Sequence, residues 1–263
     1  MEREWPVLLF SKSVLKQRKL KEITELLGKT DGLHCLDIGS DNGVISYLLR
    51  ERGGSWESAD LDENSVESIR GLVKENVVRI DGRKTDFNDN EFDRIVIVDF
   101  LEHIQTDCEF IDEVHRILKP GGKLIINVPN IKRSLLRKFR LAIGQTDEKH
   151  GHLRPGYTLD GLGRLLKGRF TIETYRTYSK FFSECIDTLI TFGFSLLKKG
   201  KAASSKGQIV TGQDMKQFQK MFRAYSIIYP VVWFFSKMDS LLFFVSGYML
   251  IVRVRINKET VRS

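Results

Sequence analysis

The sequence predicts an α/β fold built around a parallel β-sheet. Short apolar segments alternate with longer segments whose apolar residues recur at helical spacing, a pattern typical of strands joined by crossover helices. The first four apolar segments each contain an aspartate or are followed by one: Asp37, Asp60, Asp81 and Asp99. Because the carboxyl ends of parallel strands meet at one edge of the sheet, we expect these four side chains to gather there, beside a ligand crevice.

The first strand is expected at residues 35–38, where an apolar run leads into a glycine turn. An amphipathic helix over residues 11–27 precedes it, and residues 44–49 follow with helical spacing. The turn from Gly39 to Gly43 presents backbone N–H groups and the positive end of a helix at the edge of the sheet, where a polar small molecule can bind. A glycine pair also serves ordinary sharp loops, so the turn alone leaves both interpretations open.

The next strands are bounded by acids and glycines. Asp60 ends the second strand, where its carboxylate can accept hydrogen bonds from both hydroxyls of a ribose. The alternative is a helix cap, and we expect the ribose role for Asp60 and the capping role for Asp62. Thr106 and Glu109 predict a capping box. The second to fifth strands are expected at residues 55–60, 77–80, 92–100 and 123–128.

Taken in this order, the segments resemble the class I S-adenosylmethionine-dependent methyltransferases, in particular the small-molecule enzymes of the ubiquinone and menaquinone biosynthesis type. The resemblance covers residues 30–130 and implies a Rossmann-like, seven-stranded, mostly parallel sheet with an antiparallel last strand. We expect the sixth strand at residues 170–178 and the seventh at 248–256. The matching blocks are Leu36-Asp37-Ile38-Gly39 through Gly43, Asp60, Asp81 with Phe87, Phe92-Asp93, Leu101-Glu102-His103-Ile104, residues 113–122, and Asn127-Val128-Pro129-Asn130.

The resemblance implies S-adenosyl-L-methionine as the cofactor. It implies that the glycine turn approaches the methionine portion, that Asp60 holds the ribose and that Asp81 accepts a hydrogen bond from the adenine amino group. The turn departs from the family pattern at Asp41, which stands where a second glycine is usual; aspartate tolerates a left-handed backbone, but its charge lies near the cofactor. The expected cofactor-binding residues are Asp37, Gly39, Ser40, Asp41, Gly43, Asp60, Leu61, Asp81, Gly82, Asp99 and Phe100.

A hydroxyl acceptor needs a base to remove its proton during methyl transfer. His103 follows the fourth strand, and His150 and His152 lie in the loop after the fifth, so these three are the candidate catalytic residues. Each could instead be a hydrogen-bonded structural histidine. Asp99, Glu102 and His103 could together hold a divalent cation. Because metal-free relatives share the Leu-Glu-His sequence, we expect no metal.

The second half of the chain is basic and carries an insertion over residues 179–247, before the last strand. The single domain expected over residues 1–263 therefore has its core in residues 11–178 and 248–257. Residues 131–140 are expected to form a basic amphipathic helix. Within the insertion, an apolar run at 186–197 is followed by a polar linker at 200–212. Two further apolar runs, at 227–235 and 241–245, are separated by residues 236–240, and each is too short to span a bilayer. The insertion is interpreted either as a helical lid over an apolar pocket or as a patch that enters the membrane interface.

Composition and charge limit the class of protein, the partner and the cellular compartment that the sequence fits. The chain is 41% hydrophobic and 29% charged, as globular proteins are, and its net charge of +8 indicates an anionic partner. The three cysteines, Cys35, Cys108 and Cys185, are far apart and are expected to be reduced, buried thiols of a cytoplasmic protein. Residues 1–10 are too acidic and too short for a secretory signal.

These observations predict an enzyme that methylates a small or lipid-linked acceptor, such as a quinone precursor or a glycan intermediate. We expect O-methylation at the cytoplasmic face of the cell membrane, with the protein bound peripherally to anionic lipid. An RNA methyltransferase is the alternative, although nucleic acid is not the expected partner because the basic residues accompany apolar stretches. A third hypothesis is a cofactor-binding or scaffold protein in which Asp41 has impaired catalysis. The sequence leaves the oligomeric state open.

Overall fold

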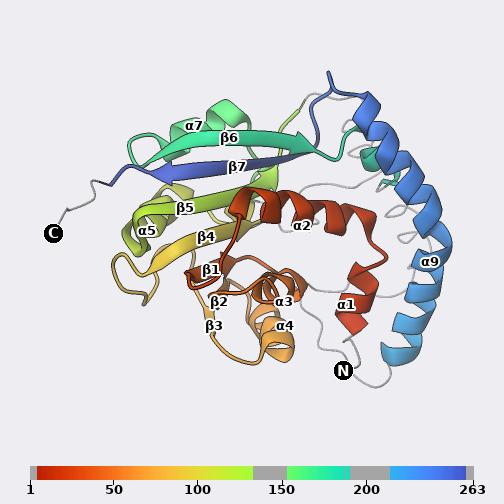
Figure 1. Ribbon diagram of the computed structural model, residues 1–263, viewed down its shortest axis with the longest axis horizontal. Coiled ribbons are helices and arrows are strands. Elements are labelled where there is room, and N and C mark those ends of the chain that lie inside the picture. The colour runs from red at the N-terminus through yellow and green to blue at the C-terminus, as the bar shows by residue number, and fades with distance from the viewer. Residues whose placement is uncertain (1–4, 133–152, 187, 190–213, 259–263) are drawn as a thin grey trace.

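In the computed structural model the chain forms a seven-stranded β-sheet with helices on both faces (Figure 1). The structure describes residues 5–132, 153–186, 188–189 and 214–258. The strands lie in the order β3-β2-β1-β4-β5-β7-β6, and β7 is antiparallel to both of its neighbours while the remaining pairs are parallel. The strands are β1 His34–Ile38, β2 Ser55–Asp60, β3 Val77–Arg79, β4 Phe92–Val98, β5 Leu118–Pro129, β6 Phe170–Tyr178 and β7 Met249–Ile256. The predicted mostly parallel sheet with an antiparallel last strand is confirmed.

The helices cover both faces of this sheet because the central strands are apolar on both sides. In β4, Ile95 and Ile97 pack with the apolar residues of α5 and α7, whereas Val96 and Val98 face the cluster that α2 completes. The helices are α1 Trp5–Phe10, α2 Val14–Leu27, α3 Val44–Arg50, α4 Glu63–Val73, η1 Leu101–His103, α5 Asp107–Ile117, α7 Leu159–Leu166, α9 Asp214–Met238 and η3 Asp239–Leu241.

Several local predictions need correction. The helix expected over residues 11–27 begins at Val14, and a separate helix, α1, precedes it. The capping box at Thr106 is wrong, because its hydroxyl donates to the carbonyl oxygen of Gly82 at 3.0 Å instead of receiving a bond from the first turn of α5. Cys35 is buried as expected, but Cys108 is exposed and Cys185 is only half-buried.

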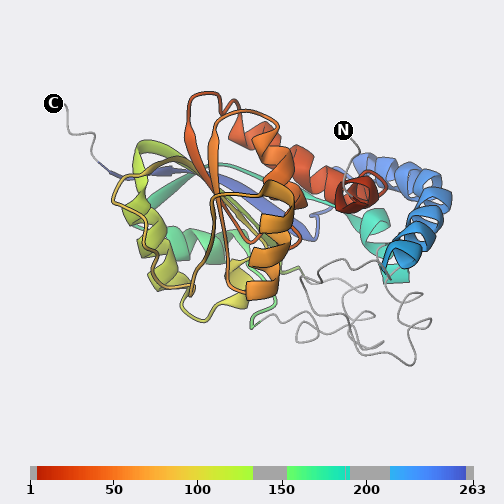
Figure 2. The same cartoon turned by 90° about the horizontal axis from the view of Figure 1, so that it is seen from below.

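The last part of the insertion forms a longer helix than the separate apolar runs predict. Residues 227–238 belong to one helix, α9, which begins at Asp214 and packs against α1 and α2. Figures 1 and 2 show α9 at the periphery of the molecule, beyond the carboxyl ends of the parallel strands. None of the helices in the described ranges is both long and apolar enough to cross a membrane. The predicted linker at residues 200–212 and most of the helix predicted at 131–140 lie outside the described residues.

Candidate active site

The carboxyl ends of β2, β1 and β4 meet in the middle of one sheet edge, where the glycine turn begins. The first residue of the turn, Gly39, is tied to β2 because its N–H donates to the carbonyl oxygen of Ala59 at 3.0 Å. On the other side, Asp99 follows β4 and its N–H donates to Asn127 of β5 at 2.9 Å. The strand order therefore brings the turn, Asp60 and Asp99 to one place, as the sequence predicted.

The turn is pressed between β4 and α4, and both of its glycines are required by this packing. Gly39 has a φ of 84°, and a Cβ atom added there would overlap the carbonyl oxygen of Val98 and lie 2.9 Å from the Cβ of Phe100. Gly43 has a φ of 75°, and a Cβ there would lie 2.7 Å from the Cα of Ile69. The glycines thus allow the backbone of the turn to approach its neighbours more closely than any side chain would permit.

Asp37 lies in β1, is fully buried, and helps to hold the turn in place through hydrogen bonds. Its carboxylate accepts hydrogen bonds from the hydroxyls of Ser40, Ser46 and Ser58 at 2.6, 2.6 and 2.7 Å, and it pairs with Arg50 at 3.5 Å. A buried carboxylate needs such partners to offset its loss of hydration. Asp37 and Ser40 therefore have structural partners inside the protein, and a direct contact of either with the cofactor stays a prediction.

Asp60 lies at the end of β2 and is only 8% exposed. Its two carboxylate oxygens accept hydrogen bonds from the N–H groups of Leu61 at 2.8 Å and Asp41 at 3.3 Å. Burial raises the pKa of Asp60 to about 6, and the nearby charge of Asp41 acts in the same direction. The neighbouring Asp62 caps α4 by accepting the N–H of Ser65 at 3.3 Å, which confirms the capping role predicted for it.

Asp41 adopts the left-handed conformation that its place in the turn predicted, with a φ of 55°. Its Oδ1 atom is buried, and it has no hydrogen-bond partner within the part of the chain that the structure describes. A buried carboxylate oxygen without a donor is costly. Asp41 and Asp60 thus form an acidic pair in which one buried oxygen, Oδ1 of Asp41, lacks a donor among the described residues, and a ligand with hydroxyl or ammonium groups would supply it.

Replacing Asp41 with glycine is expected to separate folding from binding. The substitution removes both the left-handed strain and the unsatisfied oxygen, so unfolding should become harder by about 1 kcal/mol. Loss of the acceptor should nevertheless weaken S-adenosylmethionine binding about tenfold, measured by calorimetry. Asn76→Gly is the matched control: Asn76 is exposed and has a φ of 57° outside the site, so the substitution should stabilise without changing affinity. A gain in affinity for Asp41→Gly would instead identify Asp41 as the residue that impairs the site.

Asp99 is held by two side chains at the end of β4. Lys19 of α2 forms an ion pair with its carboxylate, and the Asn127 amide donates to it at 2.8 Å. Asp99 has a φ of 47°, a further left-handed residue at this edge. Lys19 was not predicted as part of this edge, because nothing in the helical pattern of α2 indicates which strand end it reaches. Phe100 is buried against Phe110, with ring centroids 4.9 Å apart, so it packs in the core beneath the edge.

The loop after β3 carries the residues predicted for the adenine. Asp81 is exposed, and its carboxylate accepts the N–H groups of Arg83 and Lys84 at 2.7 and 3.0 Å, which hold its pKa below the ordinary value. Gly82 is buried, and a Cβ there would lie 2.7 Å from Ile104 and 3.2 Å from the side chain of Leu61. The loop therefore stays close to Asp60 through Leu61, although the adenine contacts stay predictions.

Of the three candidate histidines, the structure describes His103 alone. It lies in η1, directly after β4, and its N–H donates to the carbonyl oxygen of Phe100 at 2.9 Å. The described chain resumes at Leu153, whose N–H donates to the carbonyl oxygen of Glu102 in η1 at 2.9 Å. His150 and His152 lie outside the described residues.

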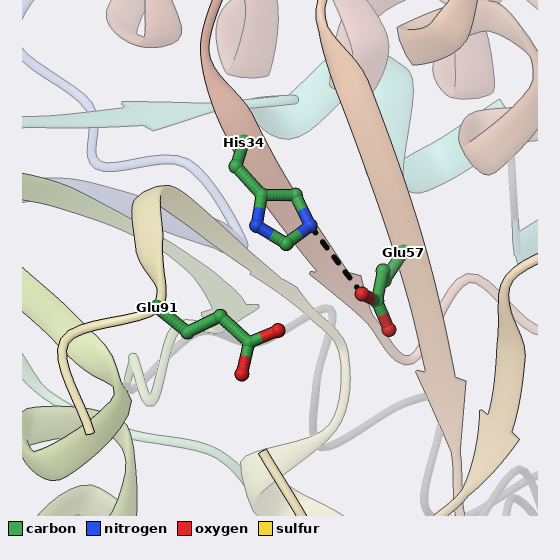
Figure 3. A group of neighbouring side chains, drawn as sticks. All are labelled: His34, Glu57 and Glu91. Atoms are coloured by element: carbon green, nitrogen blue, oxygen red, sulfur yellow. Dashed lines mark ion pairs between the residues drawn. The ribbon is translucent and has the colours of Figure 1, made fainter. Parts of the chain in front are cut away.

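A different group of side chains has the composition of a metal site. His34, Glu57 and Glu91 lie with their ligand atoms within 4.8 Å of one another at the opposite edge of the sheet, where β1 and β2 begin (Figure 3). His34 pairs with Glu57 at 3.3 Å, and Glu91 accepts the N–H of Asn88 at 2.6 Å. Protein groups thus account for this arrangement. Asp99, Glu102 and His103 do not form such a group within the described part of the chain.

Comparisons with known proteins agree with this geometry. Residues 36–126 match the family model described as a methyltransferase domain. The ubiquinone biosynthesis O-methyltransferase of Pseudomonas paraeruginosa is 28% identical over 122 residues, which cover 44% of this chain and 51% of that protein. The demethylmenaquinone methyltransferase of Tropheryma whipplei is 28% identical over 105 residues, or 39% of this chain and 44% of that protein. The chain thus spans about half the length of the curated relatives it matches.

A solved structure supports the fold. The SAM-dependent methyltransferase from Archaeoglobus fulgidus superposes with a TM-score of 0.56 at 18% identity, covering 91% of this chain and 92% of that one. The strand order, the glycine turn and the acidic sheet edge define a Rossmann-like, nucleotide-cofactor-binding domain. More particularly, residues 36–126 match the methyltransferase-domain family model, and the fold is that of class I S-adenosylmethionine-dependent methyltransferases.

Proposed function

We propose that this protein transfers the methyl group of S-adenosylmethionine to a hydroxyl oxygen of a small or lipid-linked acceptor. The observation that carries the proposal is the acidic pair at the sheet edge. Asp60 is a buried carboxylate whose protein partners are backbone N–H groups, and its pKa is raised because burial disfavours its charge. Ribose hydroxyls would donate to the remaining lone pairs of Asp60, and an ammonium group donating to Asp41 would supply the hydrogen bond that its Oδ1 atom lacks among the described residues.

The bound cofactor supplies an electrophilic methyl group on a sulfonium centre. The protein's contribution is then to hold the acceptor in line with this group and to remove the acceptor's proton. Lys19 and Asn127 hold the carboxylate of Asp99, which would then border the methionine end of the cofactor. His103 lies four residues further along the same edge and is the described residue that can accept a hydroxyl proton through its imidazole.

The acceptor class is inferred from the relatives and from the surface of the insertion. Proteins named for ubiquinone and menaquinone chemistry match the cofactor-binding half of this chain. An isoprenoid quinone precursor is therefore the first acceptor to test, and a lipid-linked glycan intermediate is the second. Either would be met at the cytoplasmic face of a membrane, which agrees with the exposed apolar residues of α9.

A second candidate function rests on Asp41. If its charge repels the cofactor carboxylate, the domain would bind S-adenosylmethionine weakly and act as a binding or scaffold protein. Calorimetry with S-adenosylmethionine separates the two functions. Binding in the micromolar range, together with transfer of labelled methyl groups to a catechol-type quinone precursor, supports the enzyme. Absence of binding at high micromolar cofactor would overturn it.

Replacing His103 with alanine is expected to lower kcat at least tenfold while cofactor affinity stays unchanged. A general base typically contributes this much or more, and the imidazole is not among the expected cofactor contacts. His115→Ala is the matched control, since His115 packs on Phe170 away from the cofactor edge, with ring centroids 5.6 Å apart. Single-turnover methyl transfer and calorimetry measure the two quantities. A loss below threefold would show that His103 belongs to the scaffold.

A further inference from the structure

The outward side of α9 is apolar, which is the reverse of an ordinary surface helix. Ile227, Val231 and Phe234 recur at the spacing of one helix face, and all three are more than half exposed. The inward side is covered: Val232 is buried, and Phe222 meets Trp5 of α1 with ring centroids 6.1 Å apart. The exposed residues therefore take no part in the packing that holds α9 in place.

The apolar side continues past the end of the helix. Leu241 in η3 is 67% exposed, and Phe243 and Phe244 in the following loop are 84% and 75% exposed. The two phenylalanine rings lie edge to face, 5.4 Å apart. We define the α9–η3 surface as Ile227, Val231, Phe234, Leu241, Phe243 and Phe244. Contiguous exposed apolar residues of this kind usually mark a binding surface.

The segment that carries the α9–η3 surface has more basic than acidic residues. Residues 214–247 contain four basic residues and two acidic residues, Asp214 at the first position of α9 and Asp239 after its end. Asp239 is buried, and its carboxylate accepts backbone N–H groups from Lys180 and Phe182 at 2.7 and 3.0 Å. Lys237 is exposed and lies over the ring of Trp233 at 5.5 Å. The surface therefore presents apolar groups and cations to solvent.

A polar groove of about 470 Å³ opens beside the same loop, with Phe243 at its rim. Four cations line it, Arg18, Lys21, Arg176 and Lys180, against two carboxylates, Glu22 and Glu25. Arg176 pairs with both carboxylates at 3.1 and 2.5 Å, Arg18 pairs with Glu22 at 2.6 Å, and Lys21 pairs with Glu25 at 3.7 Å, so each carboxylate is shared by two cations. The groove therefore has surplus positive charge next to the most exposed aromatic residue of the surface.

We propose that the α9–η3 surface binds an anionic lipid bilayer. Phe243 and Phe244 enter the interfacial region, and the groove takes the phosphate of an anionic headgroup. Aromatic residues with flanking cations are what such an interface selects. A second copy of the chain fits less well, because a two-fold contact would set the same cations against each other. This inference rests on the proposed function. Because α9 lies beyond the sheet edge that would receive the acceptor, binding of α9 to a bilayer would bring that edge close to a lipid-linked acceptor.

Vesicle flotation tests the proposal with the full chain. We expect binding to vesicles containing phosphatidylglycerol and weaker binding to phosphatidylcholine alone. The double variant Phe243→Ser with Phe244→Ser should bind about tenfold more weakly, while Val78→Ser on the distant edge strand β3 should bind as the wild type does. Lys21→Glu should weaken binding about 25-fold, because each unit of charge near the surface contributes about fivefold. Lys29→Glu, with the same change of net charge outside the groove, should weaken it no more than about threefold.

Each of the other possible outcomes has its own interpretation. Failure of the wild type to float, or equal binding by the double variant, overturns the proposal. A dimer in sedimentation that the double variant abolishes, without vesicle binding, assigns the surface to a second copy. Competition by inorganic phosphate without any flotation assigns the groove to a soluble anion. Methyl transfer to a water-soluble acceptor in the absence of vesicles tests the proposed function separately, so either proposal can fail while the other stands.

Discussion

Asp60→Asn is expected to weaken S-adenosylmethionine binding at least 100-fold. The carboxylate is the group at the end of β2 that would accept both ribose hydroxyls, and each charge-assisted hydrogen bond contributes about 1.5–3 kcal/mol. Asparagine has one acceptor oxygen, which the N–H of Leu61 already approaches at 2.8 Å in the wild type. Calorimetry measures the loss directly. Binding within fivefold of the wild type would contradict the ribose role.

The same substitution should stabilise the protein without cofactor at neutral pH. Burial raises the pKa of Asp60 from 3.8 to about 6, so the folded state holds this proton more tightly than the unfolded state. The stability from the protonated group is complete below about pH 4 and is lost as the pH rises through 6; at pH 7.5 the charged side chain costs up to about 3 kcal/mol. Asparagine avoids this cost but gives up the acceptor that faces Asp41, worth about 1 kcal/mol.

We therefore expect Asp60→Asn to be more stable than the wild type by about 1–2 kcal/mol near pH 7.5, and less stable near pH 4. Urea unfolding at both values measures this reversal. Asp62→Asn serves as the control, because asparagine also caps helices and Asp62 lies outside the predicted cofactor contacts. Cofactor affinity of the wild type should likewise fall as the pH drops below about 6, since the ribose hydroxyls need the ionised carboxylate as acceptor.

The sequence was most informative where chain neighbours determine the structure. Strand β2 occupies residues 55–60 as predicted, because Gly53 and Gly54 break the chain before it and it ends at the acidic residue Asp60. Strand β4 was recognisable from a continuous apolar run, and both of its faces are indeed covered by helices. The left-handed conformation of Asp41 followed from its place in the turn. These features depend on local sequence and on the alternation of strands and helices.

Features that depend on packing between distant segments were missed. The pairing of Lys19 with Asp99 joins residues 80 positions apart, and no helical pattern indicates which strand end a lysine reaches. Similarly, polar residues 236–240 suggested a break, but α9 continues to Met238, and Asp239 is buried because a distant segment donates N–H groups to it. Thr106 matched a capping pattern, yet its hydroxyl binds the loop at Gly82. In each case a tertiary partner replaced the expected local one.

Gly39→Ala is expected to cause the largest loss of stability among these variants. Gly39 has a φ of 84°, so alanine there pays for a left-handed backbone, about 1 kcal/mol. In addition, the new Cβ would overlap the carbonyl oxygen of Val98, which is fixed in β4 and cannot rotate away. Relief would require the glycine turn to move away from β4, so we expect a total loss of about 4 kcal/mol in the free energy of unfolding.

Gly168→Ala isolates the contribution of the overlap. Gly168 has a φ of 85°, but a Cβ there would meet no atom within 4 Å, so its substitution should cost only the backbone preference, about 1 kcal/mol. Urea denaturation of both variants gives the difference. Because movement of the turn would also displace its N–H groups from the predicted cofactor edge, Gly39→Ala should lose cofactor binding even where it remains folded, whereas Gly168→Ala should keep it. Equal losses of stability would show that β4 and the turn can separate without cost, and that their close contact does not set the geometry of the cofactor edge.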